Sequence, residues 1–287
     1  MKRSKAPYVL ASMLAGMGCT STRPVTPSAG APTPVPVITP STTASSWTFR
    51  HSPAARSYRI SRSAAIEAQM DSGMRREVST NTTHETISLE ILGDTTRILA
   101  IVDTFSTTNQ GAIGPVSAVQ LPVQLSAVLG RDSLVMIQGA AASGLCSVLE
   151  STVATDLRNL LPRFPDSLLI GQTWKDSADV SGCQAGIPMK SRYVRTFRVV
   201  GEAKQDSLPV LVVQRADSVS AHGEGSQQQH RVILDAIGTG GATYYLDFIR
   251  GQVVRLDLNQ DSNLAITASG RTTRFRQNAR EDYILVR

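Results

Sequence analysis

Residues 229–277 read QHRVILDAIGTGGATYYLDFIRGQVVRLDLNQDSNLAITASGRTTRFRQ, and this stretch decides the fold class. Apolar and polar side chains alternate in short runs, which is typical of strands with one buried face. The runs are 229–236, 242–248, 252–258, 264–269 and 272–277, and the breaks between them are Gly238–Gly241, Arg250-Gly251, Asp261–Asn263 and Gly270. Consecutive strands with such short turns must be antiparallel neighbours, because parallel strands need a long crossover. The second half therefore predicts an antiparallel meander.

Two further hairpins extend this pattern toward the N-terminus. The runs 86–91 and 96–105 flank Gly93-Asp94, and the runs 191–200 and 208–219 flank a polar segment that starts at Gly201. The chain is therefore expected to be mainly β, as an antiparallel meander or a curved half-barrel.

One segment has helical rather than strand periodicity. From Gly144 to Leu161 the apolar residues recur at three- and four-residue spacing, with Ser143 as a candidate N-cap and Pro162 as a stop. This predicts one long amphipathic helix that lies on the sheet or plugs it. Its carboxylates Glu150 and Asp156 are expected to face solvent.

The N-terminal 19 residues, MKRSKAPYVLASMLAGMGC, have the form of an export signal. Gly16-Met17-Gly18-Cys19 resembles the lipobox of bacterial lipoproteins, in which the cysteine receives diacylglycerol, so Cys19 is the expected lipidation site. Ordinary secretion and an uncleaved anchor are the alternatives. The expected division is a signal peptide at 1–19, a spacer at 20–46 and a β-rich envelope domain at 47–287, either one unit or two similar halves that meet near 162–175.

Residues 20–46 are almost entirely Ser, Thr, Pro, Ala and Val. Such a segment favours polyproline II and reaches roughly 80 Å at about 3.1 Å per residue. It therefore suits a tether between a membrane-embedded lipid and a folded domain, and a disordered tail without mechanical role is the alternative. By analogy with sorting in two-membrane bacteria, Thr20 after the cysteine favours the outer over the inner membrane.

Cysteine content and charge limit the remaining classes. With Cys19 lipidated, Cys146 and Cys183 remain as an even pair in an oxidising compartment, which favours a disulfide over two free thiols. Three basic residues of the signal contribute to the formal charge of +6, so the mature chain has only a mild excess and nucleic acid is not an expected partner.

The run Phe164-Pro-Asp-Ser-Leu-Leu-Ile-Gly-Gln-Thr-Trp174 resembles the entry to the second half of certain uncharacterised bacterial lipoproteins. In those proteins a Gly-rich segment, an aromatic-Asp strand and a glycine follow, matched here by Gly238–Gly241, Tyr244–Phe248 and Gly251. Their architecture is similar to the curved antiparallel half-barrels of periplasmic lipid and lipoprotein carriers. The resemblance implies a fold and carries over no catalytic residue.

No catalytic or metal-binding pattern stands out in the sequence. A Gly-x-Ser-x-Gly elbow is absent, and His51, His84, His222 and His230 lack close ligand pairing, although His222 and His230 are placed to meet across a hairpin. Gly238–Gly241 lies between two strand runs rather than before a helix, so we interpret it as a turn and not as a phosphate loop. The expectation is a non-enzymatic protein without cofactor or metal.

Two groups of residues are candidate contact surfaces. Tyr244, Leu246, Phe248 and Val253 share an apolar face that either lines a ligand cavity or belongs to an ordinary core. Arg271, Arg274, Arg276 and Arg280 either contact anionic lipid headgroups or saccharide phosphates, or form the solvent face of a strand on which Arg274 and Arg276 point away from Phe275.

The expected function is that of a binding or structural module of the cell envelope, with the membrane as partner through the lipid anchor and a lipid or an envelope protein as a further partner. A carrier of a lipid or other apolar ligand is the first alternative, and an unrecognised envelope enzyme is the second. A cavity above roughly 300 Å³ lined by the apolar face would favour the carrier, and an exposed apolar patch would favour a protein partner.

Overall fold

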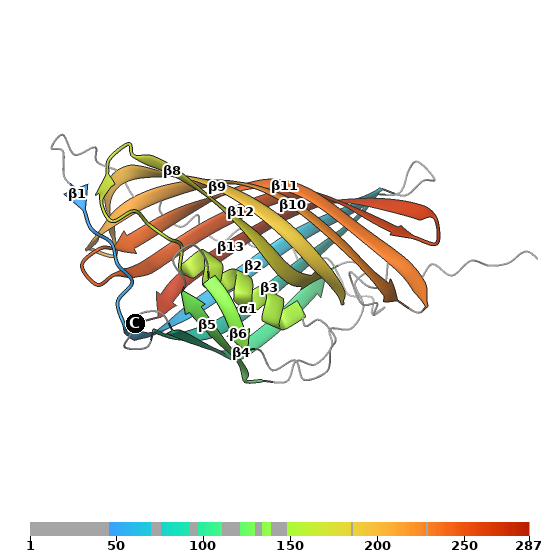
Figure 1. Ribbon diagram of the computed structural model, residues 1–287, viewed down its shortest axis with the longest axis horizontal. Coiled ribbons are helices and arrows are strands. Elements are labelled where there is room, and N and C mark those ends of the chain that lie inside the picture. The colour runs from blue at the N-terminus through green and yellow to red at the C-terminus, as the bar shows by residue number, and fades with distance from the viewer. Residues whose placement is uncertain are drawn as a thin grey trace, which may run out of the picture.

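The computed structural model describes residues 46–69, 76–91, 97–110, 121–129, 134–138, 148–184, 186–227 and 229–286. These residues form one 11-stranded antiparallel sheet, a small two-stranded sheet and one helix. The expectation of a mainly β chain with an antiparallel meander that curves into a half-barrel is confirmed (Figure 1).

The large sheet has the strand order β6-β5-β4-β3-β2-β13-β12-β11-β10-β9-β8. Its strands are β2 (Ala55–Gln69), β3 (Arg76–Ile91), β4 (Arg97–Gln110), β5 (Val123–Leu129), β6 (Leu134–Gln138), β8 (Thr173–Gln184), β9 (Ile187–Gln205), β10 (Leu208–Gln227), β11 (His230–Asp247), β12 (Gln252–Ala268) and β13 (Arg271–Val286). The small sheet pairs β1 (Ser46–Trp47) with β7 (Leu168–Leu169).

Two meanders make up the large sheet, and a single long pairing joins them. Strands β2 to β6 follow one another outward on one side, and β13 back to β8 follow on the other. The seam between them is the β2–β13 ladder, which runs from Ser57 opposite Val286 to Gln69 opposite Arg274. The strands on either side of residues 162–175 therefore belong to one continuous sheet.

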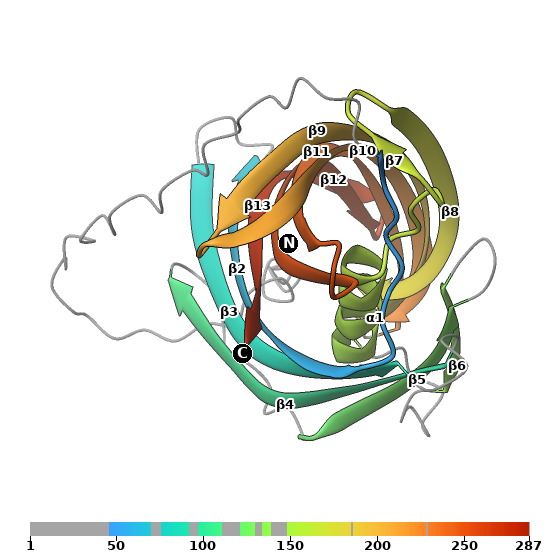
Figure 2. The same ribbon diagram turned by 90° about the vertical axis from the view of Figure 1, so that its left-hand side faces the viewer.

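Helix α1 (Val148–Leu160) lies inside the curve of the sheet, as the end-on view of Figure 2 shows. It contacts β4, β5 and β6 near one edge of the sheet and β8 at the other. The expected amphipathic helix is confirmed from Val148 onward, and its expected start at Gly144 with Ser143 as cap lies outside the described residues. Leu157 and Leu160 are buried completely, so α1 fills the opening of the half-barrel.

The main core lies between α1 and the concave face of the sheet. An aromatic group at its centre packs Trp174 on Phe197 in a stack with ring centroids 5.0 Å apart, and Phe164 meets both rings and Tyr244 edge-on. A second cluster lines the same concave face farther along the long strands, and consists of Ile187, Met189, Val232, Leu234, Leu264, Ile266, Ala268 and Phe275. The concave face therefore carries two apolar clusters at different positions along the long strands.

The two hairpins that the sequence predicted are confirmed, as β3–β4 and β9–β10. The β9–β10 turn is at Asp206 and Ser207, which have φ of 48° and 69°, whereas Gly201 lies within β9.

The turns predicted at Gly238–Gly241 and Asp261–Asn263 are wrong, because β11 and β12 run straight through them. The five predicted runs are three long strands. At Gly238 and Gly240 an added Cβ would lie 2.8 Å from the carbonyl oxygen of Asp261 and 2.5 Å from that of Asn259. These glycines therefore permit a close approach of two paired strands and do not mark a chain reversal.

The segment after β1 contacts the turn between β11 and β12 and the residues that follow α1. The Ser52 amide donates to the carbonyl oxygen of Gly251 (3.1 Å), and Gly251 has φ 59° with no room for a Cβ, which would lie 2.0 Å from the Arg50 carbonyl oxygen. His51 Nε2 lies 3.0 Å from the Pro162 carbonyl oxygen. Burial lowers the pKa of His51 to about 4, so its imidazole is neutral and Nε2–H donates this bond.

Candidate binding pocket between α1 and the sheet

A pocket of about 70 Å³ lies on the concave face, between α1 and strands β8 to β13, and has both apolar and charged lining residues. The helix contributes Thr155, Arg158 and Asn159, and inward positions of the strands contribute most of the rest. The strand residues at the pocket are Ala178, Val180, Tyr193, Arg195, Arg215, Asp217, Val219, Thr239, Gly240, Leu258, Gln260 and Glu281. The pocket thus lies at the level between the two apolar clusters.

Arg215 is held in place from three sides. Its Nε and Nη2 atoms donate to Asp217 Oδ2 at 3.0 and 2.7 Å, and Nη1 donates to Asn159 Oδ1 at 3.1 Å and to the Tyr244 hydroxyl. Because Asp217 is two residues along β10, both side chains point to the concave side. Arg215 is thereby committed to its neighbours.

Asp156 of α1 is buried at 1 % exposure, so the expectation that it faces solvent is wrong. Its Oδ1 pairs with the Arg62 guanidinium from β2 and accepts a hydrogen bond from the Tyr283 hydroxyl at 2.8 Å. Arg62 Nε also lies 3.5 Å from Glu281 Oε2. Burial raises the pKa of Tyr283 well above its usual value, so the hydroxyl keeps its proton. This cluster fastens α1 to the seam strands β2 and β13.

Arg195 of β9 pairs with Asp176 of β8 through two parallel hydrogen bonds of 2.7 Å each. Such a bidentate pair fixes the orientation of the guanidinium plane. The same group lies over the Phe197 ring, 5.7 Å from its centroid. Arg195 is therefore also fully engaged.

Arg158 differs from these arginines. Among the residues that the structure describes, no carboxylate pairs with Arg158. Burial, and to a smaller extent the neighbouring charge of Arg195, lower the pKa of Arg158, whereas Tyr193 acts in the opposite direction. Arg158 thus brings to the pocket a guanidinium that no carboxylate in the described ranges pairs with.

The carboxylate of Asp217, at the same pocket, has one oxygen without a hydrogen-bond donor among the described residues. Asp217 uses Oδ2 for Arg215, while its buried Oδ1 accepts no hydrogen bond within the described part of the chain. A buried acceptor without a partner costs about 1–3 kcal/mol. Because Oδ1 is itself buried, Arg158 is the charged group that the pocket presents to an occupant.

The residues singled out as an apolar ligand face belong to the main core. Tyr244, Leu246 and Val253 are fully buried in it, and Phe248 packs against it partly buried. A larger groove of about 350 Å³ lies elsewhere, along β2, β3 and β4. Its lining includes Ala55, Ser57, Ser88, Glu90, Leu99 and Ile101, and it contains none of the candidate ligand-face residues.

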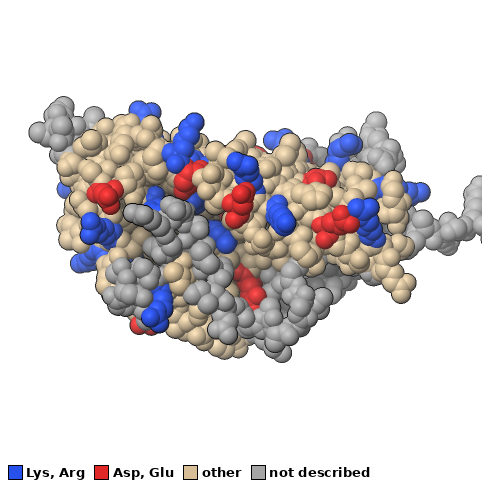
Figure 3. Space-filling view, in the orientation of Figure 1, with Lys and Arg blue, Asp and Glu red and all other residues tan. Residues whose placement is uncertain are grey.

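The arginines of β13 lie where the alternation places them. Arg271, Arg274, Arg276 and Arg280 are exposed, and Phe275 is buried on the opposite face. Arg276 is 4.0 Å from Asp261 on the neighbouring strand. In Figure 3 acidic and basic side chains are interspersed over the visible face of the molecule.

Neither the four histidines nor Cys183 belong to the lining of the pocket. His222 pairs with Asp235 (2.7 Å) and His230 approaches Ser269 (3.3 Å), so the two histidines do not meet across the hairpin; both pairs are exposed. Within the described ranges, no group of three or more His, Cys, Asp or Glu side chains is arranged to hold a metal ion. Cys183 lies in β8 opposite Pro188, whereas Cys19 and Cys146 lie outside the described residues, so lipidation and the disulfide stay predictions.

The pocket residues were missed in the sequence, although one signal for them was present. Arg195 has the same strand parity as buried Phe197, and Arg215 and Asp217 have the same parity as buried Val213. Charged residues at inward positions of a half-buried strand need partners in the interior. Arg158 gives no such signal, because the sheet residues that surround it at the pocket come from strands distant in the sequence.

Comparisons with known proteins add little. A scan against protein families finds no match, and no curated protein matches the chain. Solved structures that match include mutants of the porin of Rhodopseudomonas blastica. Two of these mutants are 9 % and 10 % identical to the chain, each match covers 80 % of this chain and 100 % of the porin, and the TM-score is 0.23 in both. In the part of the chain that the structure describes, no helix has the length and apolar character to cross a membrane.

Proposed function

We propose that the chain is an exported lipoprotein that acts as a non-enzymatic binding module of the bacterial cell envelope, with the pocket between α1 and the sheet as its binding site. The signal-like N-terminus, the lipobox-like Gly16–Cys19 and the Pro-rich spacer support the location. The observation that carries the binding role is Arg158, which lines this pocket and has no paired carboxylate among the described residues.

Pocket size favours a binding module over a carrier of a whole lipid. Sites that enclose a complete small molecule have roughly 300–1,000 Å³, and the pocket has about 70 Å³. The apolar residues that were candidates to line a lipid cavity are packed against one another in the core instead. The pocket is thus of a size to recognise one chemical group.

The proposal is tested on the full chain, isolated in mild detergent from the envelope of the cells that make it. Metabolic labelling with a fatty-acid analogue should label the wild type and not the Cys19→Ala variant, and label should follow the membrane fraction. Native mass spectrometry of the same preparation should show a bound small molecule that dissociates on unfolding.

Absence of label from the wild type would overturn the anchor, and a preparation with no bound species under any condition would overturn the binding role. Release of a complete two-chain lipid that needs the core residues for retention would favour the carrier. Turnover of the bound species into a product would favour an enzyme.

A further inference from the structure

Exposed apolar side chains gather at the end of the half-barrel where β1 begins, the end that faces the viewer in Figure 2. Four of the seven large hydrophobic side chains that are exposed in the described part of the chain lie there. They are Leu169, Ile170, Ile249 and Val286, with exposed fractions of 46, 38, 74 and 48 %. The β1–β7 pairing and the hydrogen bond from Ser52 to Gly251 connect the β7 loop, the segment after β1 and the β11–β12 turn. This end therefore presents several aliphatic side chains from adjacent loops.

The turn that carries Ile249 has a fixed shape. Asp247 Oδ1 accepts from the amides of Ile249 and Arg250 at 3.1 and 2.9 Å. The Gly251 carbonyl oxygen accepts from the Ser52 amide at 3.1 Å. Because the backbone on both sides of Ile249 is bonded, its side chain stays directed away from the core. Exposure of such a side chain is unfavourable in water and is relieved when an apolar phase takes it up.

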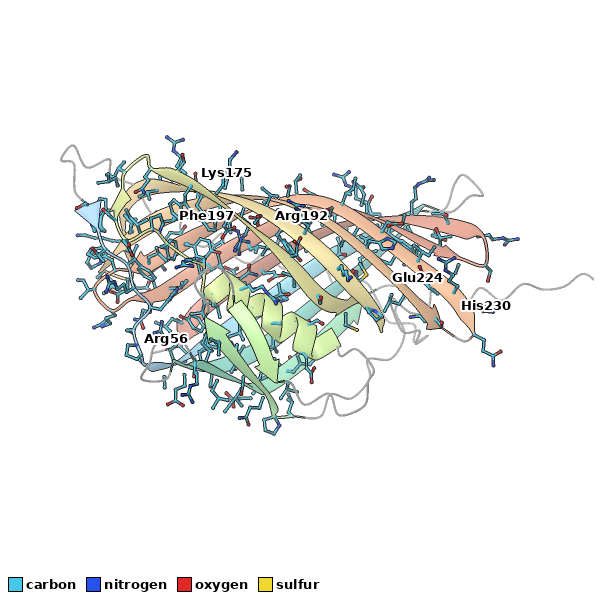
Figure 4. All side chains as sticks on the ribbon, in the orientation of Figure 1. Arg56, Lys175, Arg192, Phe197, Glu224 and His230 are labelled. Atoms are coloured by element: carbon cyan, nitrogen blue, oxygen red, sulfur yellow. The ribbon has the colours of Figure 1, made fainter. Side chains whose placement is uncertain are left out.

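The opposite end of the half-barrel is polar. Its described turns are β10–β11, with Gln227 and His230, and β12–β13, with Ser269 and Arg271. Figure 4 labels Glu224 and His230 at this end. None of the seven exposed hydrophobic side chains belongs to these two turns. The two ends therefore suit different surroundings, water at one and an apolar phase at the other.

The charge of the apolar end favours an anionic surface. Exposed basic residues outnumber exposed acidic residues in its described loops, which contain Arg50, Arg163, Lys204 and Arg250 against Asp166 and Asp206. Basic side chains are attracted to the headgroups of an anionic bilayer, and an arginine reaches the phosphates while its aliphatic part stays in apolar surroundings. Aliphatic side chains flanked by arginines are therefore suited to the boundary between headgroups and acyl chains.

The chain also enters the domain at this end. Ser46 of β1 pairs with Leu169 of β7, so the spacer that precedes Ser46, and the lipid proposed at Cys19, attach beside the exposed side chains. The proposed anchor thus keeps a bilayer within reach of this end, at a high effective concentration. This favours a bilayer over a folded partner as the phase that covers the aliphatic side chains.

We infer that this end of the half-barrel contacts the bilayer directly, with Ile249 and the pair Leu169-Ile170 inserted at the acyl-chain boundary and Arg50 and Arg250 on lipid phosphates. The inference rests on the proposed lipid anchor and adds a second membrane contact, which sets the orientation of the domain. The polar β10–β11 and β12–β13 turns then point away from the membrane.

The test places a tryptophan at the apolar end of the full chain. Ile249→Trp is reconstituted into vesicles of phosphatidylglycerol and phosphatidylcholine with brominated acyl chains, which quench a tryptophan only on contact. Ile237→Trp is the matched control, since Ile237 is 63 % exposed in the middle of β11. The signal of Trp47 and Trp174 is subtracted with the wild type. We expect blue-shifted, strongly quenched emission from position 249 and neither effect from position 237.

Equal quenching at the two positions, or none at position 249, would overturn the inference. A blue shift at position 249 without quenching by brominated lipid would also overturn it, because a protein would then cover this end. Thermal unfolding verifies that the variants fold. Ile170→Trp, on the β7 loop, gives the same comparison if Ile249→Trp does not fold.

Lipid charge and two arginines test the headgroup contact. One arginine near an anionic surface favours contact about fivefold. Quenching of Ile249→Trp should therefore decrease when phosphatidylcholine replaces phosphatidylglycerol, and when Arg50→Gln and Arg250→Gln are added on anionic vesicles. Arg192→Gln, at an exposed position of β9, is the control and should leave quenching unchanged. Quenching that depends neither on lipid charge nor on Arg50 and Arg250 would refute the phosphate contacts.

Fatty-acid labelling of the same preparation separates this inference from the proposed function. If the chain is acylated but position 249 is not quenched, the orientation is wrong and the anchor stands. If the chain is not acylated, the anchor fails, and quenching of Ile249→Trp by added vesicles decides the inference by itself.

Discussion

Replacing Asp156 by Ala tests the connection between α1 and the seam of the sheet. The substitution removes the carboxylate that pairs with Arg62 and accepts from Tyr283. Removal of one partner from a buried pair costs about 3–5 kcal/mol. Arg62 is 15 % exposed and keeps Glu281 at 3.5 Å, so the cost should lie near the lower limit, at about 3 kcal/mol.

The assay is thermal and urea unfolding of the full chain. For a domain of this size, 1 kcal/mol shifts the melting temperature by about 2–4 °C, so Asp156→Ala should melt about 6–12 °C below the wild type. Asp156→Asn keeps the shape and one acceptor oxygen without the charge, and should lie between the two. Asp179→Ala, at an exposed position of β8, is the control and should change stability by less than about 0.5 kcal/mol. An Asp156→Ala variant as stable as Asp179→Ala would refute the argument that this buried cluster holds the helix.

Four further predictions concern pH, backbone and disulfide. Burial lowers the pKa of His51 to about 4, so the folded state resists protonation of this imidazole. The free energy of unfolding should therefore be highest above pH 6.5 and decrease as the pH falls from 6.5 toward 4. Melting curves should show a smaller decrease for His51→Gln than for the wild type. Burial, and then Asp282 opposite it on β13, raise the pKa of Asp257 to about 6, so the folded state holds the proton more tightly than the unfolded state. The free energy of unfolding should therefore decrease as the pH rises from about 4 to 6. The melting temperature of Asp257→Asn, relative to that of the wild type, should be higher at pH 7.5 than at pH 4. Gly251→Ala should destabilise the protein by more than Gly171→Ala. Both glycines have a positive φ, but only at position 251 would the new Cβ lie against a backbone oxygen. Similar melting temperatures of the two variants would contradict this prediction. Peptide mapping without reduction should link Cys146 to Cys183, whereas free-thiol labelling of both in the folded protein would exclude the bond.

Alternation in the sequence predicts the sides of the strands well. It places Arg274 and Arg276 outside and Phe275 inside, and it identifies both hairpins. It fails where polar and glycine residues occur inside a long strand, since Gly238–Gly241 and Asp261–Asn263 have turn composition but pair with each other across β11 and β12. Composition alone does not distinguish a turn from a polar band in the interior of a curved sheet.

The site was less predictable than the fold. Asp156 lies three residues after Val153 and four before Leu160, so helical periodicity places it on the apolar face of α1, and its charge alone led to the expectation that it faces solvent. Periodicity places Arg158 on the opposite face of the helix. Arg62 and Tyr283 meet Asp156 on this buried face, whereas Arg158 lies at the pocket because the sheet curves around the helix and brings residues of β9 and β10 to its polar side. Such contacts join strands far apart in the sequence, and local patterns contain no information about them.

The β2–β13 seam also determines the order in which the molecule can be completed. Each meander can form from neighbouring strands as the chain is synthesised, but β2 has its second partner only when β13 is available. Until then β2 is an open edge of the kind that pairs with other chains. Because Ser57 lies opposite Val286, a linker that joins the end of β13 to the start of β1, with new termini opened at another hairpin, would bring β2 and β13 close together in the sequence. Such a circular permutant should fold faster and aggregate less during refolding than the natural order of strands.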